Sequence, residues 1–246
     1  METVTINGWT VFKSDDHIIP HIEEYPNNSE YSAWQSGFHD DIMEIYLPEN
    51  SEKRIAIDVG ANYGFTTVPF SRDFQEVHSF EVLPQVRECL IKNTKHLNNV
   101  TIHDCGLGGR NSDEDVLVHE TSPGLSIIKP QFPGTEKYKC RKLDDFNFKN
   151  VDLVKIDVEG WEPNVILGAK KTLKENSPVV IVEIHALGRS RENMFHRHQV
   201  IHTLIEYGYH IIDIRGPDIV FSKNKSQINK YLDQIFPEWW RVFSDS

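Results

Sequence analysis

Short apolar runs alternate with longer amphipathic stretches through the middle of the chain. The apolar runs are rich in β-branched residues and predict strands at 54–59, 76–82, 100–105, 151–158 and 178–185. The stretches beside them predict helices at 64–73, 84–96, 163–174 and 195–207. Strands that alternate with helices pair in parallel, with crossover helices on both faces of the sheet. We therefore expect an α/β protein with a doubly wound, mostly parallel sheet.

Three segments depart from this alternation. Residues 111–150 form alternating runs broken by turn signals, which predicts a β insertion across the end of the sheet. The runs at 208–214 and 218–222 predict a closing hairpin. Residues 1–50 are irregular and rich in aromatic side chains, which suits either a hydrophobic brace or, as we favour, a partial lid over a ligand site. We expect an N-terminal extension at 1–50 and one domain at 51–246.

Carboxylates gather where the predicted strands end. The strand-end residues are Asp58, Glu81, Asp104, Asp157, Glu159 and Glu183. In an open parallel sheet the ligand crevice lies beyond the carboxyl ends of the strands, at the point where the strand order reverses. This acidic edge is therefore the predicted ligand site.

The turn after the first of these strands contains Gly60 and Gly64 but does not match a dinucleotide fingerprint. A G-x-G-x-x-G motif that starts at Gly60 would require glycine where Asn62 and Phe65 stand. The phosphate-binding loop G-x-x-x-x-G-K-[ST] is also missing from the sequence. Asp58 directly before the turn would repel phosphate and attract a cation. The turn therefore indicates a ligand with positive charge and no pyrophosphate.

The next strand ends supply partners for the rest of such a ligand. Glu81 follows Asp58 by 23 positions, where an acidic side chain can accept both hydroxyls of a ribose. Asp104 could accept a hydrogen bond from an exocyclic amine. A ribose, an adenine and a cationic tail together describe S-adenosylmethionine.

The stretches IDVGANYGFTT, HSFEVLP, VKIDVEGWEPNVILGA and VVIVEIH stand in this order within 55–185. With them the chain resembles the FkbM-type family of S-adenosylmethionine-dependent methyltransferases. The resemblance implies a methyltransferase-type Rossmann-like fold whose last strand is antiparallel. It implies the following cofactor contacts: Gly60, Ala61, Asn62 and Gly64 along the methionine and ribose, Asp58 near the ammonium group, Glu81 at the ribose hydroxyls and Asp104 near the adenine. It also implies an oxygen acceptor on a saccharide or another small molecule.

A hydroxyl acceptor must lose its proton as it attacks the methyl group, and a carboxylate or histidine can take it. The candidates are Asp157, Glu159 and His185, with His39 less favoured. On an extended strand Asp157 and Glu159 point to the same side as Lys155. His185 could equally be a hydrogen-bonded residue that ends a buried strand. Glu162 fits better as a stabiliser of the following helix N-terminus.

A metal-assisted reaction could use Asp157 to hold Mg²⁺, but we identify no complete ligand set. His196, His198 and His202 are spaced like metal ligands, yet no HExxH motif accompanies them and the chain has 12 histidines. We assign no metal.

Other functions remain as alternatives. They are a methyltransferase acting on nitrogen or on a macromolecule, a binding module that holds the cofactor without turnover, and, third, an NAD-linked oxidoreductase. An NPPY-type signature of amide-nitrogen methylation is absent where KIDVEG stands.

Charge, hydropathy and cysteine content restrict the classes of partner and the compartment in which the protein acts. There are 26 Lys and Arg against 37 Asp and Glu, a formal net charge of −11, which disfavours nucleic acid as a partner. No apolar run is long enough to span a bilayer, and the N-terminal residues lack a signal-peptide pattern. Cys89, Cys105 and Cys140 are widely spaced and odd in number, which suits a reducing compartment. We expect a soluble, cytoplasmic protein.

Overall fold

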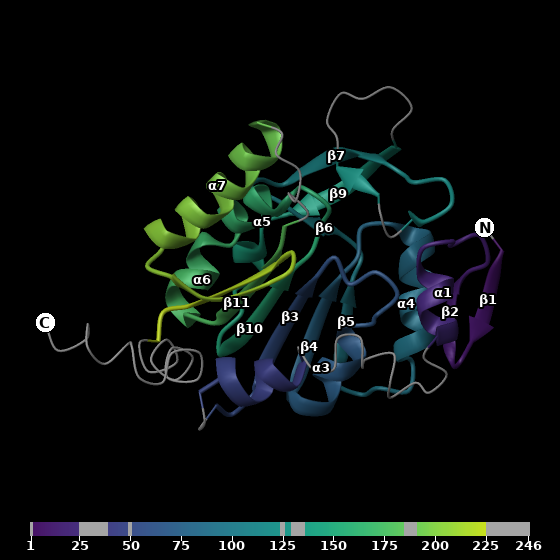
Figure 1. The fold of residues 1–246 in the computed structure, drawn as a ribbon, viewed down its shortest axis with the longest axis horizontal. Helices are drawn as coiled ribbons and strands as arrows, with labels where there is room; N and C mark the ends of the chain where they lie inside the picture. Colours follow the sequence, from purple (N-terminus) through teal and green to yellow (C-terminus); the bar gives the residue numbers. More distant parts are fainter. Residues whose placement is uncertain are drawn as a thin grey trace, which may run out of the picture.

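The computed structural model describes residues 2–24, 39–48, 51–123, 126–128, 136–184 and 191–224. Within these residues, seven strands form a central sheet in the order β12-β13-β11-β10-β3-β4-β5 (Figure 1). Its strands are β3 (Ile55–Val59), β4 (Glu76–Phe80), β5 (Val100–His103), β10 (Val151–Ile156), β11 (Val179–Glu183), β12 (His210–Arg215) and β13 (Asp218–Ser222). Strand β13 runs antiparallel to β11 and β12, whereas β3, β4, β5, β10 and β11 pair in parallel. The predicted doubly wound sheet with an antiparallel last strand is confirmed.

Helical segments cover both faces of this sheet. They are η1 (Ile42–Tyr46), α3 (Thr67–Asp73), α4 (Pro84–Thr94), η3 (Leu143–Phe146), α5 (Glu162–Gly168), α6 (Lys170–Asn176) and α7 (Arg191–Glu206). Successive strand residues point to opposite faces. Ile57 and Val154 pack in one apolar cluster with α5, α6 and α7. The adjacent Ala56 and Leu153 pack in another with η1 and Phe70 of α3.

The segment predicted as one helix at 163–174 forms two helices, α5 and α6, because the helix is interrupted at Ala169. The Asp144 carboxylate accepts hydrogen bonds from the backbone N–H of Lys171 at 2.9 Å and of Thr172 at 2.8 Å. These bonds satisfy the first N–H groups of α6 and so stabilise a second helix start. Asp144 lies in the distant segment η3, which helical periodicity cannot reveal.

A second, smaller sheet lies at the carboxyl ends of the central strands, at the top of Figure 1. Its strands, in the order β6-β9-β7-β8, are β6 (Gly106–Leu107), β7 (Ser112–Leu117), β8 (Ile127–Ile128) and β9 (Glu136–Arg141). The β insertion predicted for 111–150 is therefore present. The predicted closing hairpin is also present as β12 and β13.

The described part of the N-terminal extension packs against the main domain. A hairpin of β1 (Thr3–Ile6) and β2 (Trp9–Phe12) precedes α1 (Ile18–Glu24), and their apolar side chains cluster with Tyr63 and Val86. These contacts fit a hydrophobic brace, and the partial lid stays a prediction. The aromatic residues Tyr25, Tyr31, Trp34 and Phe38 lie outside the described residues.

All three cysteines are buried and free of disulfide bonds, as small core residues. None of the helices in the described residues is long and apolar enough to span a bilayer.

Candidate active site

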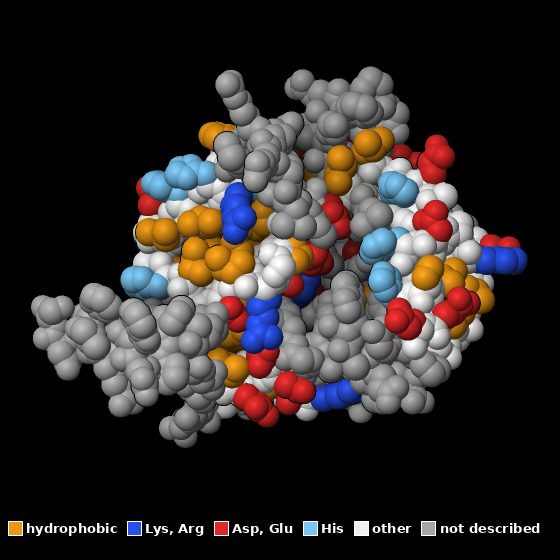
Figure 2. Space-filling view, viewed as in Figure 1, with side chains coloured by type: hydrophobic (Ala, Val, Ile, Leu, Met, Phe, Trp, Pro, Cys, Tyr) orange, Lys and Arg blue, Asp and Glu red, His pale blue; other side chains and the backbone are white. Residues whose placement is uncertain are grey.

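A cavity of about 350 Å³ lies at the carboxyl ends of β3, β4, β10 and β11. The strand order reverses between β3 and β10, so this is the switch point where open α/β sheets bind ligands. Gly106, Val116 and Ile128 of the smaller sheet line its other side. Figure 2 shows acidic side chains around a hollow near the centre of this face. The volume falls within the range of small-molecule sites, roughly 300 to 1,000 Å³.

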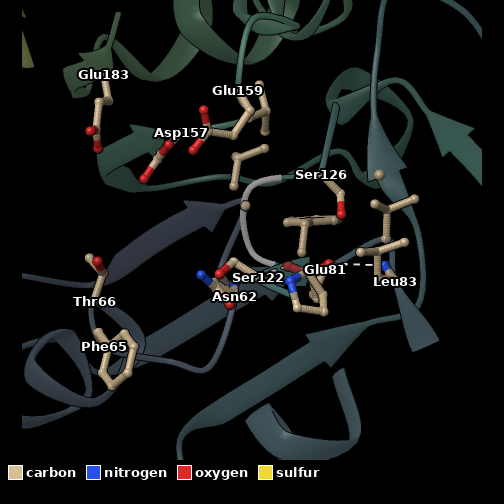
Figure 3. Close-up of a pocket in the computed structure, with 18 of the residues that line it drawn as sticks. Asn62, Phe65, Thr66, Glu81, Leu83, Ser122, Ser126, Asp157, Glu159 and Glu183 are labelled. Carbon is tan, nitrogen blue, oxygen red and sulfur yellow. Dashed lines mark hydrogen bonds between the residues drawn. The ribbon is translucent and has the colours of Figure 1, made fainter. Parts of the chain in front are cut away.

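Two groups of residues form opposite walls of this cavity (Figure 3). The glycine-turn wall consists of Gly60, Ala61, Asn62 and Glu81. The carboxyl wall consists of Lys155, Asp157, Glu159 and Glu183.

Gly60 brings the ends of β3 and β10 into contact. Its φ is +84°, and a Cβ at this position would lie 1.7 Å from the carbonyl oxygen of Asp157. The backbone N–H of Asp157 donates a hydrogen bond to the Val59 carbonyl at 2.9 Å. Only glycine permits so close an approach with this φ. The turn therefore joins the two walls directly.

Glu81 holds the glycine turn through backbone hydrogen bonds. Its carboxylate accepts the N–H of Asn62 at 3.0 Å and the N–H of Leu83 at 2.9 Å. Burial raises the pKa of Glu81 to about 7, and the two backbone hydrogen bonds oppose this shift. Asn62 has a left-handed φ of +48°, and its buried Oδ1 has no hydrogen-bond partner among the described residues. An unpaired acceptor in a cavity wall is costly unless a ligand donates to it.

Lys155 ties the carboxyl wall together. Its side chain is 6% exposed, and its Nζ lies 3.0 Å from Oδ2 of Asp157 and 3.8 Å from Oε2 of Glu183. Burial alone would lower the pKa of Lys155, but the surrounding carboxylates, Asp157 foremost, hold it above its usual value. Burial raises the pKa of Asp157 to about 8, with Lys155 opposing and Glu183 adding to the shift. Asp157, whose protonation depends on the charges of Lys155 and Glu183, therefore faces the glycine turn across the cavity.

Glu162 shapes the turn after β10 from behind. Its buried carboxylate accepts the N–H of Val158 at 3.2 Å and of Gly160 at 3.0 Å, and it lies 2.7 Å from Nε2 of His196. These bonds hold Glu159, whose φ is +51°, in a left-handed conformation at the cavity. Glu162 therefore has a structural role, in the turn before α5; stabilisation of the helix N-terminus itself stays a prediction.

Three of the predicted cofactor residues do not line the cavity. Asp58 is buried behind the turn, where the Thr67 hydroxyl donates to it at 2.6 Å. Gly64 packs toward Leu90 of α4. Asp104 is exposed and follows β5, the strand at the edge of the sheet and farthest from the switch point. Of the predicted cofactor residues, the structure thus brings Gly60, Ala61, Asn62 and Glu81 together at the cavity. Asp58, Gly64 and Asp104 do not line it.

The catalytic candidates divide in a similar way. Asp157 and Glu159 line the cavity, whereas His185 lies outside the described residues. His39 lies away from the cavity, with its Nε2 2.8 Å from Oδ2 of Asp73. Among the described residues, no group of three or more His, Cys, Asp or Glu side chains could hold a metal ion.

Sequence reasoning assigned no role to two residues that line the cavity. Glu183, one of the predicted strand-end carboxylates, ends β11 with its side chain on the same sheet face as Lys155. Asp15 also lines the cavity, where its carboxylate accepts hydrogen bonds from the Tyr63 hydroxyl at 2.7 Å and the Ile18 N–H at 3.0 Å. No motif marks Asp15. Its contacts connect the N-terminal extension to the glycine turn.

Comparison with known proteins identifies the family. The model of the methyltransferase FkbM domain matches residues 58–211. Methyltransferase 1 of Beauveria bassiana is 24% identical over 157 residues, which cover 52% of this chain and 63% of that protein. The crystal structure of the FkbM methyltransferase from Methylobacillus flagellatus matches with a TM-score of 0.52 at 16% identity, over 85% of this chain and 55% of that one. This chain therefore spans only part of the length of either relative. Because the family model covers more than half of it, the chain belongs to the FkbM methyltransferase family.

Proposed function

We propose that this protein is an S-adenosylmethionine-dependent methyltransferase that methylates a hydroxyl oxygen of a saccharide or another small molecule. The observation that carries the proposal is the cavity at the switch point, where the glycine-turn wall faces a wall of carboxyl groups around one buried lysine. Membership of the FkbM family supports methyl transfer as the reaction class.

The glycine-turn wall fits the cofactor. Glu81 uses each carboxylate oxygen once for the turn and keeps further lone pairs for ribose hydroxyls. The unpaired Oδ1 of Asn62 offers an acceptor to the same ligand. Gly60 and Ala61 present backbone without bulky side chains, which suits close contact with the methionine and ribose parts. Gly60, Ala61, Asn62 and Glu81 would therefore hold S-adenosylmethionine.

Bound S-adenosylmethionine supplies an electrophilic methyl group, and the protein supplies orientation, exclusion of water and a proton acceptor. The smaller sheet and the start of α1 enclose the cavity from outside and limit access of water. Asp157 lies on the wall opposite the glycine turn, where it can take the proton of an acceptor hydroxyl. Glu159 lines the same wall and could orient the acceptor through hydrogen bonds.

The charge of the described walls favours acceptors without negative charge. Asp15, Glu81, Asp157, Glu159 and Glu183 line the cavity, with Lys155 as a buried cation already paired with carboxylates. A phosphate or carboxylate on the acceptor would meet like charges at short range. An uncharged sugar hydroxyl meets hydrogen-bond acceptors instead.

Calorimetry tests the cofactor, and a labelled transfer assay tests the reaction. We expect S-adenosylmethionine to bind and NAD not to bind. A protein that binds neither, or NAD alone, contradicts the proposal. Incubation with methyl-labelled cofactor and matched acceptors, such as a neutral sugar and its phosphate, should label the neutral sugar preferentially. Binding without transfer to any hydroxyl, amine or macromolecule in the panel would indicate a non-catalytic binding module.

A further inference from the structure

Carboxyl groups from several strands surround Lys155. Besides Asp157 and Glu183, the charges of Asp218 and Asp58 act on its ammonium group. Lys155 is paired in register with Asp58 on β3, and Glu183 with Asp218 on β13. Because side chains alternate along a strand, these residues lie on one face of the sheet, at its cavity end. One buried cation therefore serves four carboxyl groups.

Asp157 and Glu183 lie side by side at the ends of β10 and β11. They directly follow Ile156 and Val182, which are partners in the register of the two strands, and their carboxyl groups lie 3.0 Å and 3.8 Å from Nζ of Lys155. Two ionised carboxylates around one ammonium group repel each other, and Lys155 supplies a single compensating charge. A proton on one of the two groups removes this repulsion and lets that group donate a hydrogen bond to the other. The geometry therefore favours one carboxylic acid and one carboxylate that share a proton.

We propose that Asp157 and Glu183 act as one proton-accepting pair for the acceptor hydroxyl, with Lys155 as the positioning residue that holds both carboxyl groups at the cavity. This inference rests on the proposed methyl transfer. In the transfer step, the hydroxyl proton passes to the carboxylate of the pair. The acceptor oxygen forms a bond to the methyl carbon, and the electrons of the broken carbon–sulfur bond remain on sulfur.

The raised pKa of Asp157 agrees with a shared proton. Burial first, and then Glu183, raise the pKa of Asp157 to about 8, so the pair holds one proton at neutral pH and retains one negative charge. The charged groups that face the pair are Asp58 on β3, Lys155 on β10, Asp218 on β13 and Glu159 in the following turn. Lys155 is the cation among them. Removing its charge should make the pair bind protons more tightly, whereas removing Glu183 should release the proton from Asp157.

The test is a ¹³C NMR titration of the whole protein with carboxyl-labelled Asp and Glu, in the wild type and in single variants. Asp157→Asn and Glu183→Gln assign the resonances. We expect a wild-type step near pH 8 that both carboxyl groups report. Glu183→Gln should lower the titration of Asp157 by more than about one pH unit, and Lys155→Met should raise it by a similar amount. Lys155→Arg should restore the wild-type step.

Activity and binding separate this inference from the proposed function. Glu183→Gln should lower kcat at least about tenfold while S-adenosylmethionine affinity stays within twofold. Lys155→Met should move the acid limb of the rate profile to higher pH and recover activity under alkaline conditions. Asp113→Asn, an exposed aspartate on β7, serves as the matched control.

Separate titration of Asp157 and Glu183 below about pH 5 would overturn the pair, whatever the protein methylates. A wild-type rate in Glu183→Gln would overturn its role even if the proton is shared. Loss of the proposed function would instead show as failure to bind S-adenosylmethionine, with the NMR titration unchanged. If Lys155→Met does not fold, Glu183→Gln alone decides between these outcomes.

Discussion

The glycine-turn wall and the carboxyl wall meet at one cavity but are held in different ways. The glycine turn is fixed by backbone geometry, through the positive φ of Gly60 and the two N–H groups that Glu81 accepts. The carboxyl wall is fixed by side-chain charges around Lys155. The backbone conformation of Gly60 does not depend on pH, whereas the carboxyl wall depends on the number of protons bound around Lys155. We infer that the first wall determines binding and the second determines turnover.

The largest expected effect is on turnover, in Asp157→Asn. The variant keeps the shape of the carboxyl wall but removes a proton acceptor, so methyl transfer should fall about 10² to 10⁴-fold. S-adenosylmethionine affinity measured by calorimetry should stay within about twofold, because Asp157 is not part of the glycine-turn wall. Asp113→Asn is the control. Unchanged turnover in Asp157→Asn would contradict the division between the walls.

Gly60→Ala should break the contact between the two walls. The added Cβ would meet the Asp157 carbonyl at 1.7 Å with a φ of +84°, so the free energy of unfolding should fall by at least about 3 kcal/mol. Gly160→Ala is the matched control, since its φ is +99° but no atom lies within 4 Å of the added Cβ. There we expect a loss of only about 1 to 2 kcal/mol. Equal losses in chemical denaturation would show that close approach is not what Gly60 provides.

Glu81→Ala should weaken binding more than turnover. Two backbone N–H groups lose their acceptor and the ribose loses its partner, which corresponds to about 1.5 to 3 kcal/mol, or roughly 10 to 150-fold in S-adenosylmethionine affinity. Isothermal calorimetry measures this loss. Glu88→Ala, at an exposed position on α4, should bind like the wild type. A wild-type affinity in Glu81→Ala would remove Glu81 from the cofactor site.

The raised pKa values of Glu81 and Asp157 also predict how stability changes with pH. The folded protein keeps these protons up to about pH 7 and about pH 8, whereas ordinary carboxyl groups in the unfolded chain lose them near 4 to 4.5. The folded state therefore binds more protons in this range, and the free energy of unfolding should decrease as the pH rises from about 5 to 8. Each group should contribute about 1 to 3 kcal/mol, measured by denaturant titration. Glu81→Gln and Asp157→Asn should each flatten the slope; an unaltered slope would place the ionisation elsewhere.

The smallest effect is expected at Asp104, for which the family resemblance implies a position near the adenine. Its side chain is exposed and does not line the cavity, so Asp104→Asn should change S-adenosylmethionine affinity by no more than about twofold. A tenfold loss of S-adenosylmethionine affinity would instead show that the cofactor site reaches Asp104, at the end of β5. The same calorimetric titration as for Glu81→Ala decides the matter.

Local patterns predicted the order of the elements well and their tertiary contacts poorly. The apolar runs and turn residues placed every strand of the central sheet and the closing hairpin, because period and turn chemistry act over a few residues. The sequence did not predict the interruption between α5 and α6 at Ala169, because the first N–H groups of α6 donate to Asp144, which lies in another segment. Asp58 was expected at the ligand, but its carboxylate is buried behind the turn and accepts a hydrogen bond from the Thr67 hydroxyl.

The sequence by itself determined the doubly wound sheet, the glycine turn and the set of strand-end carboxylates, because parallel strands bring their carboxyl ends to one edge whatever the details of packing. Only the tertiary structure decided which carboxylates share the cavity. Asp104 follows β5, an edge strand, and does not line the cavity, whereas Glu183 lies on the same sheet face as Lys155 and Asp157. That choice follows from strand order and side-chain alternation across neighbouring strands, which no single segment of the sequence contains.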